Sequence, residues 1–165
     1  MCVTPVAHFL FFRGNMIITF CGHSDHVGNA EEEKKIIAFL TEKIGDEPAE
    51  LFLGGYGFFD DFACRCGKKY QKTHPNVKLV FVTPYVTENY QENYLERIKK
   101  LYDYTIYPEI EDKPLRFAIF YRNRWMVEKA DYVVACVNHY WGGAYQTYRH
   151  AKRKKKPIFN IGSLE

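Results

Sequence analysis

Short apolar runs alternate with longer amphipathic segments along this chain. Residues 17–21 are apolar or β-branched and end at Gly22, which predicts a buried strand. Residues 30–44 then carry apolar side chains at helical spacing, with three glutamates in the first turn, which predicts a helix. The alternation continues, with strands expected at 50–53, 77–82, 132–137 and 157–161, a short extended piece at 105–108, and helices at 58–70, 89–101, 114–129 and 144–153.

This order of elements predicts the fold class α/β, with a Rossmann-like parallel sheet of about five strands and helices on both faces. The 165 residues suit one domain, which we place at 16–165. Residues 1–15 do not fit the alternation, and Met16 offers an alternative start. We therefore expect residues 1–15 to be an N-terminal extension or a misassigned start.

Two paired-glycine turns stand between a predicted strand and a predicted helix. They are residues 54–57 (GGYG) and 142–147 (GGAYQT). Glycine lets the backbone approach a ligand closely, and amide groups at a helix start attract an anion. The two turns together favour a site for a phosphorylated or ribosylated ligand over two tight turns that bind nothing.

Four loops are expected to converge, because ligands of parallel sheets bind at the carboxyl ends of the strands. The loop after residue 21 offers small residues and the Ser24 hydroxyl. Segment 121–125 offers Arg122, which either clamps a phosphate or lies on an exposed helix face. The expected ligand-binding residues are Gly22, Ser24, Gly54, Gly55, Gly57, Arg122, Gly142, Gly143 and Thr147.

Two acids, Asp60 and Asp61, follow the first glycine turn and are the candidate catalytic residues. Acids in the first turn of a helix are ordinarily partners of the helix dipole, and this interpretation is favoured. The alternative is that they hold ribose hydroxyls or act as a general base.

The net charge of +3 comes with a basic run near the C-terminus, at residues 149–156. Such a run can bind nucleic acid phosphates, but it also lies at the end of the last predicted helix, where cations complement the dipole. We favour the helix-end interpretation because nucleic-acid binding usually needs a broader basic face. The aromatic content of 17% is interpreted as core and rim rather than as base stacking.

The five cysteines form no zinc-spaced set, and the six histidines form no H-x-x-x-H or H-E-x-x-H motif, so no metal site is expected. The dinucleotide fingerprint and the P-loop are also absent from the sequence, and no cofactor is expected. The cysteines are interpreted as reduced thiols and the protein as cytoplasmic. No stretch approaches the ~20 apolar residues of a membrane helix.

The four loops together resemble those of the SLOG superfamily, which includes the LOG phosphoribohydrolases and the DNA-uptake protein DprA/Smf. Residues 20–24 (FCGHS) are similar to its first-strand signature, and residues 53–57 (LGGYG) to its second-strand glycine motif. Residues 122–131 are similar to its Arg…Met…Asp segment, and 142–147 to its phosphate loop. The resemblance spans residues 17–161 and is closest to the YpsA-like bacterial branch.

The resemblance implies a Rossmann-like fold that binds nucleotides, with Arg122 as a ligand-binding arginine. In the phosphoribohydrolases a glutamate three residues after the Gly-Thr motif works with this arginine, and here His150 holds that position. Glu128 lies near in sequence, but no motif supports it as a substitute. Cleavage of a glycosidic bond would therefore depend on Asp60 or Asp61.

Three functions follow from these observations. The favoured one is binding of a nucleotide or nucleotide-derived ligand, in a sensor or regulatory role, by a protein that forms a homodimer. The first alternative is an N-glycosidic-bond hydrolase or transferase that acts on nucleotides. The second is an oligomeric DNA-associated protein that uses the basic run. Nucleic acid is not the favoured partner, and no membrane partner is expected.

Overall fold

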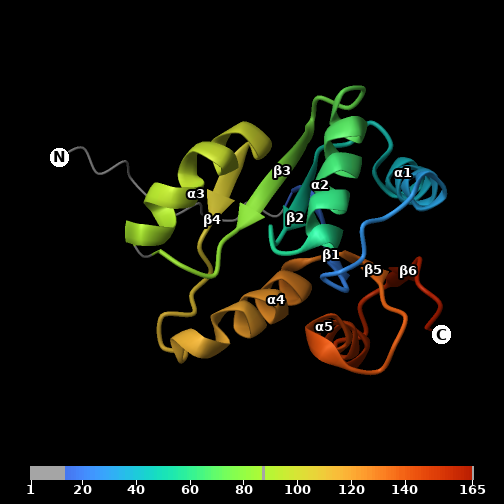
Figure 1. Ribbon diagram of the computed structural model, residues 1–165. Helices are drawn as coiled ribbons and strands as arrows, with labels where there is room; N and C mark the ends of the chain where they lie inside the picture. Colours follow the sequence, from blue (N-terminus) through green and yellow to red (C-terminus); the bar gives the residue numbers. More distant parts are fainter. Residues whose placement is uncertain (1–13, 87, 165) are drawn as a thin grey trace.

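Six parallel strands form one open sheet in the order β4-β3-β2-β1-β5-β6 (Figure 1). The computed structural model describes residues 14–86 and 88–164. The strands are β1 (Met16–Gly22), β2 (Ala49–Leu53), β3 (Val77–Val82), β4 (Tyr104–Ile106), β5 (Tyr132–Cys136) and β6 (Ile158–Asn160). The helices are α1 (Ala30–Ile44), α2 (Phe58–Gln71), α3 (Glu88–Leu101), α4 (Ala118–Lys129) and α5 (Gly142–Arg153), with a 3-10 turn, η1 (Leu115–Phe117), before α4.

Helices cover both faces of the sheet (Figure 1). On the face toward α1, α2 and α3, one buried apolar cluster includes Ile18 and Phe20 of β1. On the face toward α4 and α5, the buried side chains include Ile17 and Cys21 of the same strand. Alternate residues of β1 are thus buried on opposite faces, which explains why its sequence is an unbroken apolar run.

The strand order reverses at β1. Strands β2, β3 and β4 lie on one side of it, whereas β5 and β6 lie on the other. β1 and β5 pair from Ile18↔Tyr132 to Gly22↔Cys136. The loops that leave their carboxyl ends run to opposite faces of the sheet, and the crevice between such loops is the usual position of a ligand in this architecture.

The expected fold class is confirmed, with three differences in detail. The sheet has one strand more than expected, because residues 104–106 pair with β3 as the edge strand β4. The helix expected at 114–129 begins as the 3-10 turn η1 after Pro114, and α4 starts only at Ala118. α5 begins at Gly142 rather than at residue 144, so the glycine pair forms the first turn of that helix.

α1 begins with a capping box. The Asn29 side chain accepts a hydrogen bond from the Glu32 N–H at 2.9 Å, and the Glu32 carboxylate accepts one from the Asn29 N–H at 3.1 Å. Each bond satisfies a backbone N–H that helix geometry leaves without a partner. The reciprocal pair also fixes the Glu32 side chain over the start of the helix.

Across residues 14–86 and 88–164, none of the helices combines the length and the apolar character of a membrane span. Of the expected extension at 1–15, residues 1–13 lie outside the described residues.

Candidate functional site

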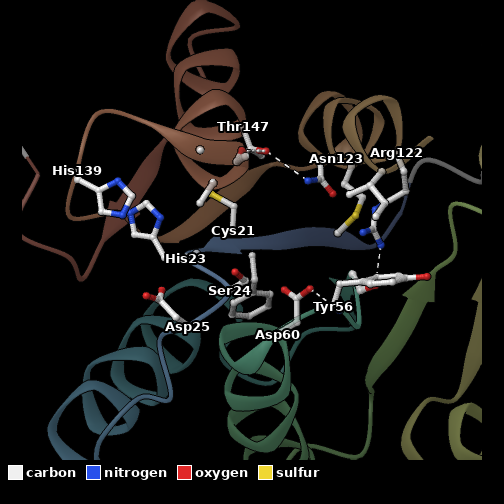
Figure 2. A pocket seen from close by; sticks show the side chains of 18 residues that line it. Cys21, His23, Ser24, Asp25, Tyr56, Asp60, Arg122, Asn123, His139 and Thr147 are labelled. Atoms are coloured by element: carbon white, nitrogen blue, oxygen red, sulfur yellow. Dashed lines mark hydrogen bonds between the residues drawn. The ribbon is translucent and has the colours of Figure 1, made fainter. Parts of the chain in front are cut away.

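A cavity of about 450 Å³ lies at the carboxyl ends of β1 and β5 (Figure 2). Its walls come from the loops after β1, β2 and β5 and from α2, α4 and α5. Segments far apart in the sequence therefore meet around one hollow at the point where the strand order reverses. The expected site residues that line it are Gly22, Ser24, Gly54, Asp60, Arg122, Gly142, Gly143 and Thr147.

Two of the expected glycines, Gly55 and Gly57, do not line the cavity. Gly55 has a φ of +71°, and a Cβ there would lie 2.5 Å from the Phe81 ring. Gly57 has a φ of +90°, and a Cβ there would lie 2.8 Å from the Ser24 side chain. Backbone conformation and close packing therefore account for both glycines without a ligand.

The two neighbouring acids of α2 have different surroundings. Asp61 lies outside the cavity lining and pairs at the surface with Arg97, 3.5 Å away. Asp60 lines the cavity, and its carboxylate accepts a hydrogen bond from the Tyr56 N–H at 2.7 Å. Burial raises the pKa of Asp60 from 3.8 to about 6, although the Arg122 charge and the Tyr56 hydrogen bond both lower it. Asp60 is therefore the acid that can act in the cavity near neutral pH.

Arg122 of α4 is a buried cation at the wall of the cavity, with 1% of its surface exposed. Its Nη1 donates to the carbonyl oxygens of Gly54 at 2.7 Å and of Val82 at 2.6 Å. The guanidinium carbon lies 5.6 Å from the centre of the Tyr56 ring. The exposed-face interpretation of Arg122 is thus wrong. This side chain joins the ends of β2 and β3. It also brings positive charge to the cavity, where Figure 2 shows it above Tyr56.

The first turn of α5 lines the cavity with the backbone of two glycines, Gly142 and Gly143, which no side chain of their own covers. The residue before it, Trp141, makes no side-chain capping bond. A Cβ added at Gly142 or Gly143 would meet no atom within 4 Å. The Thr147 hydroxyl donates to the Gly143 carbonyl at 2.9 Å, so its proton is used inside the helix. The groups that can attract an anion here are the backbone amides and the helix dipole.

The sequence did not predict a stack of three rings at one end of the cavity, two of which, His23 and His139, are seen in Figure 2. His23 stacks on His139 with ring centroids 3.6 Å apart, and His139 stacks on Trp141 at 3.8 Å. Nε2 of His23 accepts a hydrogen bond from the Asn138 N–H at 3.1 Å. Burial, together with His139, lowers the pKa of His23, which favours the neutral ring. The available signal was the aromatic run at 139–141, directly before the second glycine pair.

The position that corresponds to the phosphoribohydrolase glutamate is not in the cavity lining. His150 is 2% exposed, and its Nε2 lies 2.9 Å from the Glu128 carboxylate, which also lies outside the lining. Burial lowers the pKa of His150. The pair joins α5 to α4, and neither residue brings a carboxylate to the cavity.

Two lysines of the basic run at the end of α5 make contacts within the protein. Nζ of Lys156 donates to the carbonyl oxygens of Glu128 and Ala130, at 3.0 Å and 2.8 Å. Lys152 lies over the Tyr148 ring, with its Nζ 4.8 Å from the ring centre. These contacts agree with the interpretation of the run as a helix end.

No protein-family model matches this chain, and no curated protein sequence matches it. Solved structures do match. DNA processing protein A from Helicobacter pylori, described for its single-stranded DNA binding mode, is 15% identical, with 89% of this chain and 65% of that chain covered and a TM-score of 0.57. The molybdenum cofactor binding protein from the phototrophic bacterium Rippkaea orientalis is 14% identical, with 93% and 80% covered and a TM-score of 0.57. DNA processing protein A from Streptococcus pneumoniae is 12% identical, with 92% and 52% covered and a TM-score of 0.56.

These likenesses confirm the Rossmann-like α/β fold that the sequence predicts, and they show that DNA processing protein A and the molybdenum cofactor binding protein share it. The chain spans 65% and 52% of the two DNA processing proteins. The closer likeness to the YpsA-like branch stays a prediction.

Replacing Arg122 with Met should destabilise the protein by about 3 kcal/mol, because two buried carbonyl oxygens lose their donor and Asp60 loses its counter-charge. The matched control is Arg124→Met on the same helix, where the side chain is half-buried and lies over the Phe120 ring. This control should cost less than about 1 kcal/mol. Urea unfolding of both variants measures the difference, and equal losses would contradict the role assigned to Arg122.

Asp60 should make the protein less stable as the pH rises. Its folded-state pKa of about 6 lies above its ordinary value of 3.8, so the folded state binds the proton more tightly than the unfolded state. Between these two pH values, the unfolding free energy of the wild type should fall relative to Asp60→Asn by as much as about 3 kcal/mol. Denaturant unfolding of both proteins across this interval checks the slope, and a constant difference would contradict the raised pKa.

Proposed function

We propose that this protein binds a nucleotide or a nucleotide-derived ligand in the cavity at the carboxyl ends of β1 and β5. The observation that carries the proposal is that one side of the cavity attracts anions and another side accepts hydrogen bonds. The uncapped glycine start of α5 forms one side and the buried Asp60 carboxylate forms another. Figure 2 shows Thr147 of α5 and Asp60 of α2 on opposite sides of β1.

The two sides suit different groups of one ligand. The amides and dipole of α5 favour a phosphate, for which Gly142 and Gly143 leave open space. Asp60 accepts hydrogen bonds, which suits the hydroxyl groups of a ribose and disfavours a phosphate on that side. Arg122 adds positive charge and holds the Gly54 loop in place. Gly22 at the end of β1 and Ser24 in the loop after it also line the cavity and approach the ligand from that side.

The stacked rings supply a surface for an aromatic base. Trp141 has 67% of its surface exposed and continues the stack that starts with His23 and His139 in the cavity wall. A planar base can extend such a stack, and stacking of this kind contributes about 1–3 kcal/mol to the binding free energy. The cavity volume of about 450 Å³ also lies in the range of small-molecule sites. The likeness to a molybdenum cofactor binding protein supports a small-ligand role for this fold.

Placing a negative charge at the α5 start should prevent anion binding without harming the fold. In Gly143→Asp the carboxylate should weaken nucleotide binding at least about tenfold, or 1.4 kcal/mol. The same charge should leave stability unchanged or raise it by about 0.5 kcal/mol, because acids suit a helix N-terminus. Calorimetry with nucleoside monophosphates, ADP-ribose and NAD measures the affinity, and thermal unfolding measures the stability.

The control is Gly143→Asn, which has nearly the same shape and no charge. Gly143→Asn should bind the nucleotide much more tightly than Gly143→Asp does, and equal losses in the two variants would point to steric exclusion instead.

Fluorescence adds a second readout, since Trp125 and Trp141 are the two tryptophans of the chain. In the background Trp125→Phe, ligand binding should quench Trp141. Absence of binding by the wild type at millimolar ligand would overturn the proposal.

A second candidate function, cleavage or transfer of an N-glycosidic bond, rests on Asp60. This carboxylate lines the cavity and has a pKa of about 6, which suits a general base or nucleophile near neutral pH. The carboxylate used by the phosphoribohydrolases has no counterpart there, because His150 and Glu128 pair outside the lining. We therefore rank this function below binding.

Release of free base from a nucleotide tests the catalytic candidate. Asp60→Asn should abolish release while ligand binding persists, because the amide keeps an acceptor for the Tyr56 N–H but cannot take a proton from water. The control Asp61→Asn should leave release unchanged, since Asp61 lies outside the cavity lining and pairs with Arg97. No release from any nucleotide by the wild type would remove this function and leave binding intact.

The other expected partners stay predictions. A role in DNA binding receives little support from the basic run, because Lys156 is used to cap the end of α4.

A homodimer gains support from an exposed apolar surface on η1 and the start of α4. Its residues are Leu115, Phe117, Ile119 and Phe120.

A further inference from the structure

Three side chains with metal-binding atoms lie together outside the cavity lining. They are His26 in the β1–α1 loop, Glu32 in the first turn of α1 and Cys136 at the end of β5. Their ligand atoms all lie within 4.8 Å of one another. The sequence predicted no metal site because these residues follow no ligand spacing, and only the fold brings the three segments together.

We propose that His26, Glu32 and Cys136 bind one Zn²⁺ ion. Thiolate, imidazole and carboxylate are the ligands that zinc takes in proteins, and three of them leave a fourth position for water. Ligands about 2.0–2.3 Å from a tetrahedral ion lie roughly 3.3–3.8 Å from one another, so the group can close on an ion with shifts of about 1 Å. The thiolate and the carboxylate together balance the charge of the ion.

The surrounding contacts already orient the donors. Oε2 of Glu32 accepts a hydrogen bond from the Asn29 N–H and lies 2.9 Å from Nε2 of His26. The His26 ring packs near the Phe59 ring, with centroids 6.2 Å apart. The hydrogen bond from the Asn29 N–H holds the Glu32 carboxylate in position, as such bonds do for carboxylates that bind metals. An ion would enter between Glu32 and His26 and replace their direct contact.

Zinc binds cysteine as the thiolate, so the proton of Cys136 would be released when the ion binds. The ion would tie the β1–α1 loop to β5. This site is separate from the nucleotide proposal.

Titration of the metal-free full chain with Co²⁺ tests the proposal. One Co²⁺ per chain should bind, with a thiolate-to-metal charge-transfer band and the visible bands of tetrahedral cobalt, and Zn²⁺ should displace it. Cys136→Ala should lose the charge-transfer band. The control Cys64→Ala, which removes another buried free thiol, should keep it. Zn²⁺ should raise the Tm of the wild type and of Cys64→Ala but not that of Cys136→Ala.

Glu32→Gln provides a variant that should fold normally, because glutamine can also complete the capping box. It should bind Zn²⁺ at least about tenfold more weakly, since the anionic ligand is lost. The metal site is refuted if the wild type binds no stoichiometric metal, or if the charge-transfer band survives in Cys136→Ala. Either result would leave nucleotide binding untouched, because none of the three residues lines the cavity.

Discussion

A buried positive charge organises the cavity end of the sheet. The last carbonyl of β3 and the first carbonyl after β2 point to the same place, and neither can be left without a donor in a dry interior. Arg122 supplies both hydrogen bonds from a helix on one face of the sheet. A guanidinium is suited to this task because it stays charged and offers several donors in a rigid plane. The loop after β2 therefore has one position relative to α4.

The charge of Arg122 also determines which other charges the cavity can contain. Burial disfavours the ionised form of Asp60, and the guanidinium offsets part of that cost, which leaves the carboxyl group balanced between its two protonation states. Bare amides at the α5 start complete the arrangement from the opposite wall. The cavity thus presents an acceptor and an anion-attracting surface in separate places, and a ligand that contains both kinds of group can satisfy each of them.

The strands could be predicted from the sequence because a sheet that is covered on both faces demands continuous apolar runs, such as the one in β5. For the edge strand β4 the sequence predicted only a short extended piece at 105–108, since its three residues are mostly exposed and carry no such run. The glycine pairs indicated the end of the sheet where the cavity lies, but the sequence could not distinguish Asp60 from Asp61. Successive residues on a helix point in directions about 100° apart, so which one meets the cavity depends on how α2 is seated.

Contacts that form only in the tertiary structure also could not be predicted from the sequence. His23 and His139 stack although more than a hundred positions separate them, and nothing in the local pattern of either segment indicates the contact. The same holds for Cys136 and the α1 start, which are joined by the pairing of β1 with β5. Spacing motifs detect sites built within one segment, whereas the cavity and the proposed metal site are lined by residues from several segments.

The pairing of β1 with β5 has a consequence for the order of folding. Strands β1, β2 and β3 pair with their sequence neighbours across single crossovers, but β5 must return past three intervening strands to join β1. Closing so long a loop is entropically costly and slow. The cavity at the carboxyl ends of those two strands depends on their pairing, so a chain that has formed only its first four strands lacks it. The proposed ligand would therefore bind only to a chain that has folded through α5.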